Sequence, residues 1–134
     1  MTTHITGEYD TLDWKEAPYA EIDDTRKLSN VTANGTFSGG IEATSVVSYL
    51  LAYGPDGCDF IGYEHVSGKL DGRSGSFVLE HKGNTEGKGL VATTTIVPGS
   101  GTEELTGVRG TGRYVWTGEE GQRARLDLDY DFGG

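Results

Sequence analysis

Residues 37–53 read FSGGIEATSVVSYLLAY, and apolar side chains recur along them at every second position. The odd positions include Phe37, Ile41 and Val47, whereas the even positions include the polar Glu42. Side chains alternate between the two faces of a β-strand, so this spacing predicts a strand with one buried face. A helix would need a repeat of three to four residues, which this stretch lacks.

Two glycine-containing pairs lie near the start of this segment. Asn34-Gly35 is a strong hairpin signal, which leaves the register between residues 34 and 40 open. The alternation nevertheless passes Gly39-Gly40 without a change of phase. That continuity favours one bent or bulged strand across the pair.

The rest of the chain repeats the pattern. Leu126, Leu128, Tyr130 and Phe132 alternate with charged residues that we expect to face water. Further strands, each bounded by Gly, Asp, Asn or Pro, are expected over residues 4–14, 27–33, 59–67, 76–82, 89–97 and 105–116. This makes about eight strands and leaves no room for a helix of ordinary length.

About eight strands with short connections predict an up-and-down meander that removes its exposed edges by closing on itself. A chain of 134 residues supports one core. We therefore expect residues 1–134 to form a single all-β domain, a closed antiparallel up-and-down barrel. Such a barrel is either filled by side chains or holds one small ligand. An open two-sheet sandwich is the alternative.

The net charge of the chain narrows the range of possible binding partners. Eleven Lys and Arg against 21 Asp and Glu give a net charge of −10, which disfavours binding to nucleic acids or to membrane surfaces. Cys58 is the single cysteine, so no internal disulfide forms. With no basic and apolar leader and no apolar run of membrane-spanning length, the protein is expected to be cytoplasmic.

Two titratable residues share phase with the apolar face of their strands. Glu64 aligns with Phe60 and Val66, and His81 aligns with Phe77. A charged group inside a barrel needs a partner or a ligand, and both residue types serve as general acids or bases. Glu64 and His81 are therefore the candidate catalytic residues.

Each of the two has a structural alternative. His81 lies near the end of its expected strand, so it is equally a partly exposed residue at the barrel rim. Glu64 is equally an ion-pair partner of Arg73 or Arg109 at a barrel end.

Aromatic residues on the apolar faces are candidates for the walls of a substrate pocket. The substrate-binding candidates are Tyr49, Phe60, Phe77, Trp116 and Tyr130, with Arg109 as a grip for an anionic group. Core packing explains the aromatic residues equally well. Ser45 and Asn30 are further polar candidates.

Metal and cofactor sites are not predicted. His4, His65 and His81 are scattered along the chain, and His65 is out of phase with Glu64. The string Gly99-Ser100-Gly101 lacks the strand-to-helix setting of a nucleophile elbow. Any chemistry would therefore proceed without a cofactor.

Several strings together resemble the DUF3224 family of bacterial proteins: FSGGIE at 37–42, YLLAY at 49–53, GKLDGRSGSFVLEH at 68–81, VPGSGT at 97–102 and LDLDY at 126–130. The resemblance implies a β-barrel similar to the allene oxide cyclases, whose superfamily also includes small cyclases of polyketide biosynthesis. Ala43 stands where the family pattern suggests a glycine, and Glu103-Glu104 follow Thr102 where a glycine is also expected.

Three functions fit these observations. The first is a cofactor-free isomerase or cyclase of natural product biosynthesis that folds a hydrophobic, polyketide-like substrate inside the barrel. The alternative is a carrier or sensor that binds an apolar ligand in the lumen without catalysis. The third is a filled barrel with a structural role or a role in a homo-oligomer.

Overall fold

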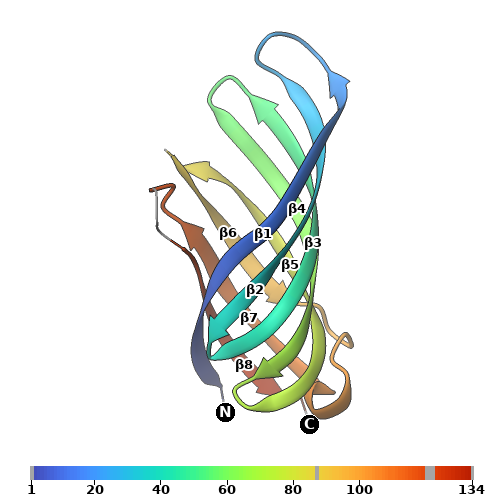
Figure 1. Cartoon of the computed structure of the whole chain (residues 1–134), viewed down its shortest axis with the longest axis vertical. Coiled ribbons are helices and arrows are strands. Elements are labelled where there is room, and N and C mark those ends of the chain that lie inside the picture. The colour runs from blue at the N-terminus through green and yellow to red at the C-terminus, as the bar shows by residue number, and fades with distance from the viewer. Residues whose placement is uncertain (1, 87, 120–122, 134) are drawn as a thin grey trace.

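The computed structural model describes residues 2–86, 88–119 and 123–133, which form an all-β fold (Figure 1). In chain order the strands are β1 (Thr3–Glu21), β2 (Lys27–Gly39), β3 (Ile41–Gly54), β4 (Gly57–Leu70), β5 (Arg73–Glu86), β6 (Gly89–Ile96), β7 (Val108–Trp116) and β8 (Ala124–Phe132). One short 3₁₀ helix, η1 (Glu103–Leu105), precedes β7, and the described residues contain no α-helix. None of the helical structure in these ranges is long and apolar enough to cross a membrane.

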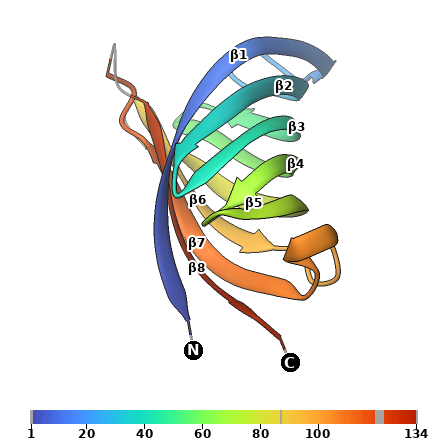
Figure 2. The ribbon, with the colours of Figure 1, turned by 60° about the horizontal axis from the view of Figure 1, so that its bottom comes forward.

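Each strand pairs antiparallel with its neighbour in the chain, and β1 also pairs with β8. The sheet therefore closes into a ring, which Figure 2 shows with β1 and β8 side by side. Both termini lie at the same end of the ring (Figure 1). The prediction of eight antiparallel strands in one closed sheet is confirmed, and the two-sheet alternative is wrong.

The prediction of one continuous strand across Gly39-Gly40 is wrong. β2 ends at Gly39, whose φ of 98° suits glycine, and the chain reverses before β3 begins at Ile41. Phe37 pairs directly with Ala43 across this hairpin, so the odd-numbered residues face inward on both strands. The period is thus the same on either side of the turn, and the alternation alone does not reveal the reversal.

Asn34-Gly35 forms no turn and lies inside β2. Gly35 pairs with Ser45 of β3 and with Thr11 of β1. The hairpin signal of this pair is overridden because β2 has a partner strand on both sides.

The strands differ in length, and this difference opens the ring at one end. β1 and β8 pair only from Thr3 opposite Tyr130 to Tyr9 opposite Ala124. Beyond Tyr9, β1 continues with β2 alone, and the β1–β2 and β3–β4 hairpins extend past the short strands β6 to β8 (Figure 1). The inner face is therefore enclosed at the end near the termini and accessible at the other.

The enclosed end is filled by apolar side chains. Among the largest side chains that are almost fully buried are Ile41, Leu70, Phe77, Leu105, Leu126 and Leu128. A filled interior of this kind supplies the hydrophobic stabilisation of the fold, because these groups leave water on folding. Within the described residues, the lumen is thus a packed core at the end near the termini.

Candidate functional site

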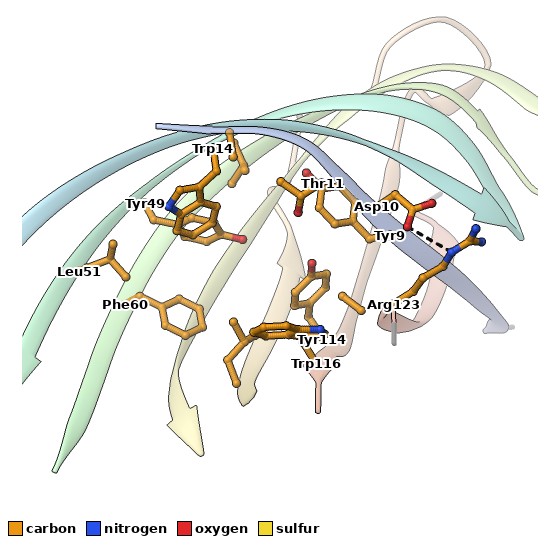
Figure 3. Close-up of a pocket in the computed structure, with 14 residues that line it drawn as sticks. Tyr9, Asp10, Thr11, Trp14, Tyr49, Leu51, Phe60, Tyr114, Trp116 and Arg123 are labelled. Carbon is orange, nitrogen blue, oxygen red and sulfur yellow. Dashed lines mark ion pairs between the residues drawn. The ribbon is translucent and has the colours of Figure 1, made fainter. Parts of the chain in front are cut away.

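A cavity of about 390 Å³ lies in the open end of the ring (Figure 3). The side chains that line it are Tyr9, Asp10, Thr11, Trp14, Ala33, Val47, Tyr49, Leu51, Phe60, Leu90, Tyr114, Trp116, Arg123 and Ala124. The cavity begins where the β1–β8 pairing ends, since Tyr9 and Ala124 form the last pair of that ladder. Its position therefore follows from the point at which the ring stops being closed.

A β-bulge in β1 brings an additional aromatic ring to this cavity. The register between β1 and β2 shifts between Thr11 and Asp13, which leaves Leu12 as the extra residue. The shift places Trp14 opposite Ala33, whose side chain faces inward. Without the bulge Trp14 would point to the outside of the sheet, because each residue of slip reverses the face.

Two glycines leave room for tyrosine side chains. A Cβ on Gly62 would lie 2.5 Å from the ring of Tyr49. A Cβ on Gly35 would lie 2.3 Å from the Tyr9 hydroxyl oxygen. The rings of Tyr9 and Tyr49 thus lie flat across neighbouring strands, which only the absence of a side chain allows.

A chain of buried polar groups crosses four consecutive strands below the cavity. Ser45 Oγ on β3 donates a hydrogen bond of 2.6 Å to Glu64 Oε2 on β4. A hydrogen bond of 2.7 Å joins Glu64 Oε1 to His81 Nε2 on β5, and one of 2.8 Å joins His81 Nδ1 to Thr94 Oγ1 on β6. Both carboxylate oxygens and both ring nitrogens therefore have a partner, as buried polar groups require.

Glu64 and His81 do not line the cavity. Their side chains are 2% and 0% exposed, and all their polar atoms are engaged within the chain of hydrogen bonds. The rings of Tyr49 and Tyr114 lie 6.1 Å and 5.3 Å from the His81 ring and also line the cavity. Tyr49 and Tyr114 thus border both the polar chain and the cavity.

The tyrosines around the cavity have raised pKa values. Burial raises the pKa of both Tyr49 and Tyr114 well above the usual value, and the nearby Glu64 carboxyl adds to the effect. Burial also raises the pKa of Tyr9, an effect that Ser45 opposes. The Tyr9 hydroxyl is buried and makes no hydrogen bond within the described residues. At neutral pH the walls therefore present neutral phenol groups.

Two charged residues at the mouth are paired with each other. Arg123 Nε lies 3.2 Å from Asp10 Oδ1, an ion pair drawn in Figure 3, and Arg123 Nη1 lies 3.5 Å from Glu8 Oε2. All three side chains are about half exposed. Exposed ion pairs of this kind add little stability, so their main effect is to offset part of the negative charge at the mouth.

The structure brings half of the expected substrate-binding residues to the cavity. Tyr49, Phe60 and Trp116 line it. Phe77 is 2% exposed and belongs to the packed core. The other two candidates lie elsewhere: Tyr130 donates a hydrogen bond of 2.8 Å to Asp71, and Arg109 is exposed and ion-paired with Asp131.

The structural alternatives for the two titratable residues are wrong. His81 is fully buried, not at a rim, because the β5–β6 hairpin continues beyond it to Glu86 opposite Gly89. Glu64 pairs with His81 and with neither arginine. Arg109 binds Asp131, while the Arg73 guanidinium stacks over the ring of Phe132. Of the polar candidates, Ser45 joins the buried chain and Asn30 is exposed.

Most other residues of the cavity lining were not predicted from the sequence, among them Tyr9, Trp14, Tyr114 and Arg123. Tyr114 shares phase with Trp116 on an expected strand, so the signal for it was present. No pattern in the sequence marked the bulge at Leu12 that turns Trp14 inward. Arg123 precedes β8 and reaches the mouth through contacts with the distant Glu8 and Asp10.

Metal-binding side chains do not gather in the described ranges. No group of three or more His, Cys, Asp or Glu residues there is placed to hold a metal ion.

Comparison with known proteins identifies the fold and one family. The family described as "Protein of unknown function (DUF3224)" matches residues 5–130. A crystal structure of a protein with unknown function from this family, from Shewanella oneidensis MR-1, is similar with a TM-score of 0.79 and 29% identity, covering 100% of this chain and 99% of the other. No curated protein matches the chain.

Replacing Glu64 tests the buried polar chain. We expect Glu64→Leu to lower the free energy of unfolding by about 1–3 kcal/mol for each group it leaves unpaired, Ser45 Oγ and His81 Nε2. Glu64→Gln keeps polar atoms at both ends and should lose less. Chemical denaturation measures the free energy of unfolding of both variants. Glu42→Leu, a substitution at an exposed glutamate, is the control. Equal stability of the Leu and Gln variants would contradict the arrangement.

Alkaline unfolding tests the burial of the phenols. Their pKa is near 10 in the unfolded chain and well above that in the folded protein, so the folded state binds more protons above pH 10. Stability is therefore fully present below about pH 10 and falls as the pH rises, by about 1.4 kcal/mol per pH unit for each such tyrosine.

The variant Tyr49→Phe/Tyr114→Phe should accordingly show a shallower decline of unfolding free energy above pH 10 than the wild type. Denaturant titrations at a series of pH values measure the two slopes. Parallel curves would mean that these hydroxyls ionise as readily in the folded protein as in the unfolded chain.

Proposed function

The chain belongs to the DUF3224 family over residues 5–130, whose description assigns no function, and from the geometry of the pocket we propose that the protein binds a hydrophobic small molecule inside the strand ring. The observation that carries the proposal is a cavity of about 390 Å³ with mostly apolar and aromatic walls. Ligand pockets have about this size and this kind of lining.

The burial of Glu64 and His81 favours ligand binding over catalysis as the function. General acid–base catalysis needs a group within hydrogen-bond reach of the substrate. Glu64 and His81 are buried, hydrogen-bonded to each other and absent from the cavity lining. A carrier or sensor needs no such group, so ligand binding in the lumen is the function that the geometry supports best.

We also propose a fold type, a class of binding partner and a cellular location for the protein. Closure of the sheet through β1 and β8, together with a cavity inside it, supports a calycin-like barrel similar to the allene oxide cyclases. The proposed partner is an apolar small molecule, with no nucleic acid or membrane surface involved. The proposed location is the bacterial cytoplasm.

A second candidate is a cofactor-free isomerase or cyclase acting on a hydrophobic, polyketide-like substrate. The observation in its favour is the contact of the Tyr49 and Tyr114 rings with His81. If one ring moves, His81 and Glu64 become accessible from the cavity. Glu64 and His81 would then act as acid and base.

Binding of a neutral fluorescent probe tests the first function. N-phenyl-1-naphthylamine should increase its emission on entering the apolar cavity. Val47→Phe fills the cavity wall and should weaken binding at least about tenfold, a loss of about 1.4 kcal/mol. Val46→Phe, on the outer face of the same strand, is the matched control and should bind as the wild type does. No binding by the folded wild-type protein, or equal binding by both variants, would overturn the proposal.

Analysis of recovered ligands tests the second function. Hydrophobic extracts incubated with the protein are separated and compared by mass and retention before and after incubation. The binding function predicts recovery of unchanged ligand. An isomerase would convert a ligand at constant mass, and the conversion would disappear in Glu64→Gln and His81→Phe. Conversion that survives both substitutions would remove the catalytic role assigned to these residues.

A further inference from the structure

Besides the fully buried hydroxyl of Tyr9, two further tyrosine hydroxyls of the cavity walls have no partner within the described residues. The hydroxyls of Tyr49 and Tyr114 make no hydrogen bond within the described residues, although both tyrosines are largely buried. Figure 3 shows both hydroxyl groups turned towards the space between the walls. Buried polar groups are normally hydrogen-bonded, so a ligand that fills the cavity must either bond to these hydroxyls or leave them unsatisfied.

These hydroxyls are available as hydrogen-bond donors. The Glu64 carboxyl group, which acts electrostatically on both tyrosines, is already hydrogen-bonded at both oxygens, to Ser45 and to His81. Burial keeps both phenols protonated, so each retains an O–H to donate. The two groups lie close together, since Tyr49 adds to the rise that burial causes in the pKa of Tyr114. Two donors are therefore directed at one region of the cavity.

The charges around the cavity disfavour an anionic ligand. Arg123 is the cation in the lining, and it is paired with Asp10 and Glu8 at the mouth. An anionic ligand would therefore have no free cation in the described lining and would lie near Glu64. Burial of an unpaired charge in an apolar cavity is strongly unfavourable. A neutral ligand avoids these penalties.

The aromatic walls of the cavity also favour a ligand of a particular shape. Aromatic rings from three parts of the ring of strands face the cavity: Trp14 on β1, Tyr49 and Phe60 on β3 and β4, and Trp116 on β7. The Tyr49 and Phe60 rings pack edge to face with centroids 5.5 Å apart. Rings on facing walls favour a flat, aromatic or conjugated molecule, because such a molecule stacks on them with little loss of its own flexibility.

We propose that the ligand is a neutral, planar molecule with a carbonyl oxygen, and that the hydroxyls of Tyr49 and Tyr114 donate hydrogen bonds to that oxygen. A carbonyl oxygen has two lone pairs and so accepts a hydrogen bond from each of the two hydroxyls. This inference rests on the proposed function, and it specifies the chemical class of the ligand at the same site.

A pair of isosteric ligands tests the inference. 2-Acetylnaphthalene carries a carbonyl where 2-isopropenylnaphthalene carries a carbon–carbon double bond, and the two have nearly the same shape. Each is titrated against the protein loaded with N-phenyl-1-naphthylamine. The ketone should displace the probe at about fivefold lower concentration than the alkene, as expected for one or two added hydrogen bonds.

Phenylalanine variants locate the donors. In Tyr49→Phe/Tyr114→Phe the preference for the ketone should disappear while affinity for the alkene is retained, which separates loss of the donors from loss of the fold. Tyr63→Phe, whose hydroxyl lies outside the ring and donates to Glu80, is the control and should keep the wild-type preference.

Each outcome discriminates between the two proposals. Equal displacement by ketone and alkene, or a preference that survives in the double variant, would overturn the carbonyl inference and leave ligand binding intact. Failure of both naphthalenes to displace a bound probe would also overturn it. Failure of the probe itself to bind the wild-type protein would overturn the proposed function and this inference with it.

Discussion

The pairing of β1 with β8 is the constraint on which the rest of the structure depends. The ladder from Thr3 opposite Tyr130 to Tyr9 opposite Ala124 joins the first strand to the last and removes two exposed sheet edges. It also encloses the inward faces, so that their apolar side chains share one interior. Because the ladder ends at Tyr9, the enclosure ends there too, and the cavity lies at that boundary.

The interior is divided along the axis of the ring into a packed end and an open end. Phe77 and Leu128 fill the first, and Tyr49, Phe60 and Trp116 surround the cavity in the second. The polar chain from Ser45 to Thr94 is also buried and touches the cavity through Tyr49 and Tyr114. The packed end supplies the hydrophobic stabilisation of the ring, so the open end need not be filled by side chains.

The polar chain shows how a closed sheet accommodates charge-bearing groups in its interior. Ser45, Glu64, His81 and Thr94 come from β3, β4, β5 and β6, and each is one strand away from the next. His81 and Thr94 are directly opposite in the ladder, while the others are offset along their strands. Neighbouring strands thus supply the hydrogen-bond partners within this polar chain. None of its four side chains depends on a ligand for a hydrogen bond.

By itself the sequence determined which side chains point inward, because alternation along a strand is a local property of the backbone. It identified the inward positions of Glu64, His81 and Phe60 without knowledge of the partner strands. Only the tertiary structure decided how far along the axis of the ring each inward residue lies. That position depends on the register between strands, some of which are distant in sequence. For that reason Phe77 and Phe60 were indistinguishable beforehand, and the bulge that turns Trp14 inward left no mark in the alternation.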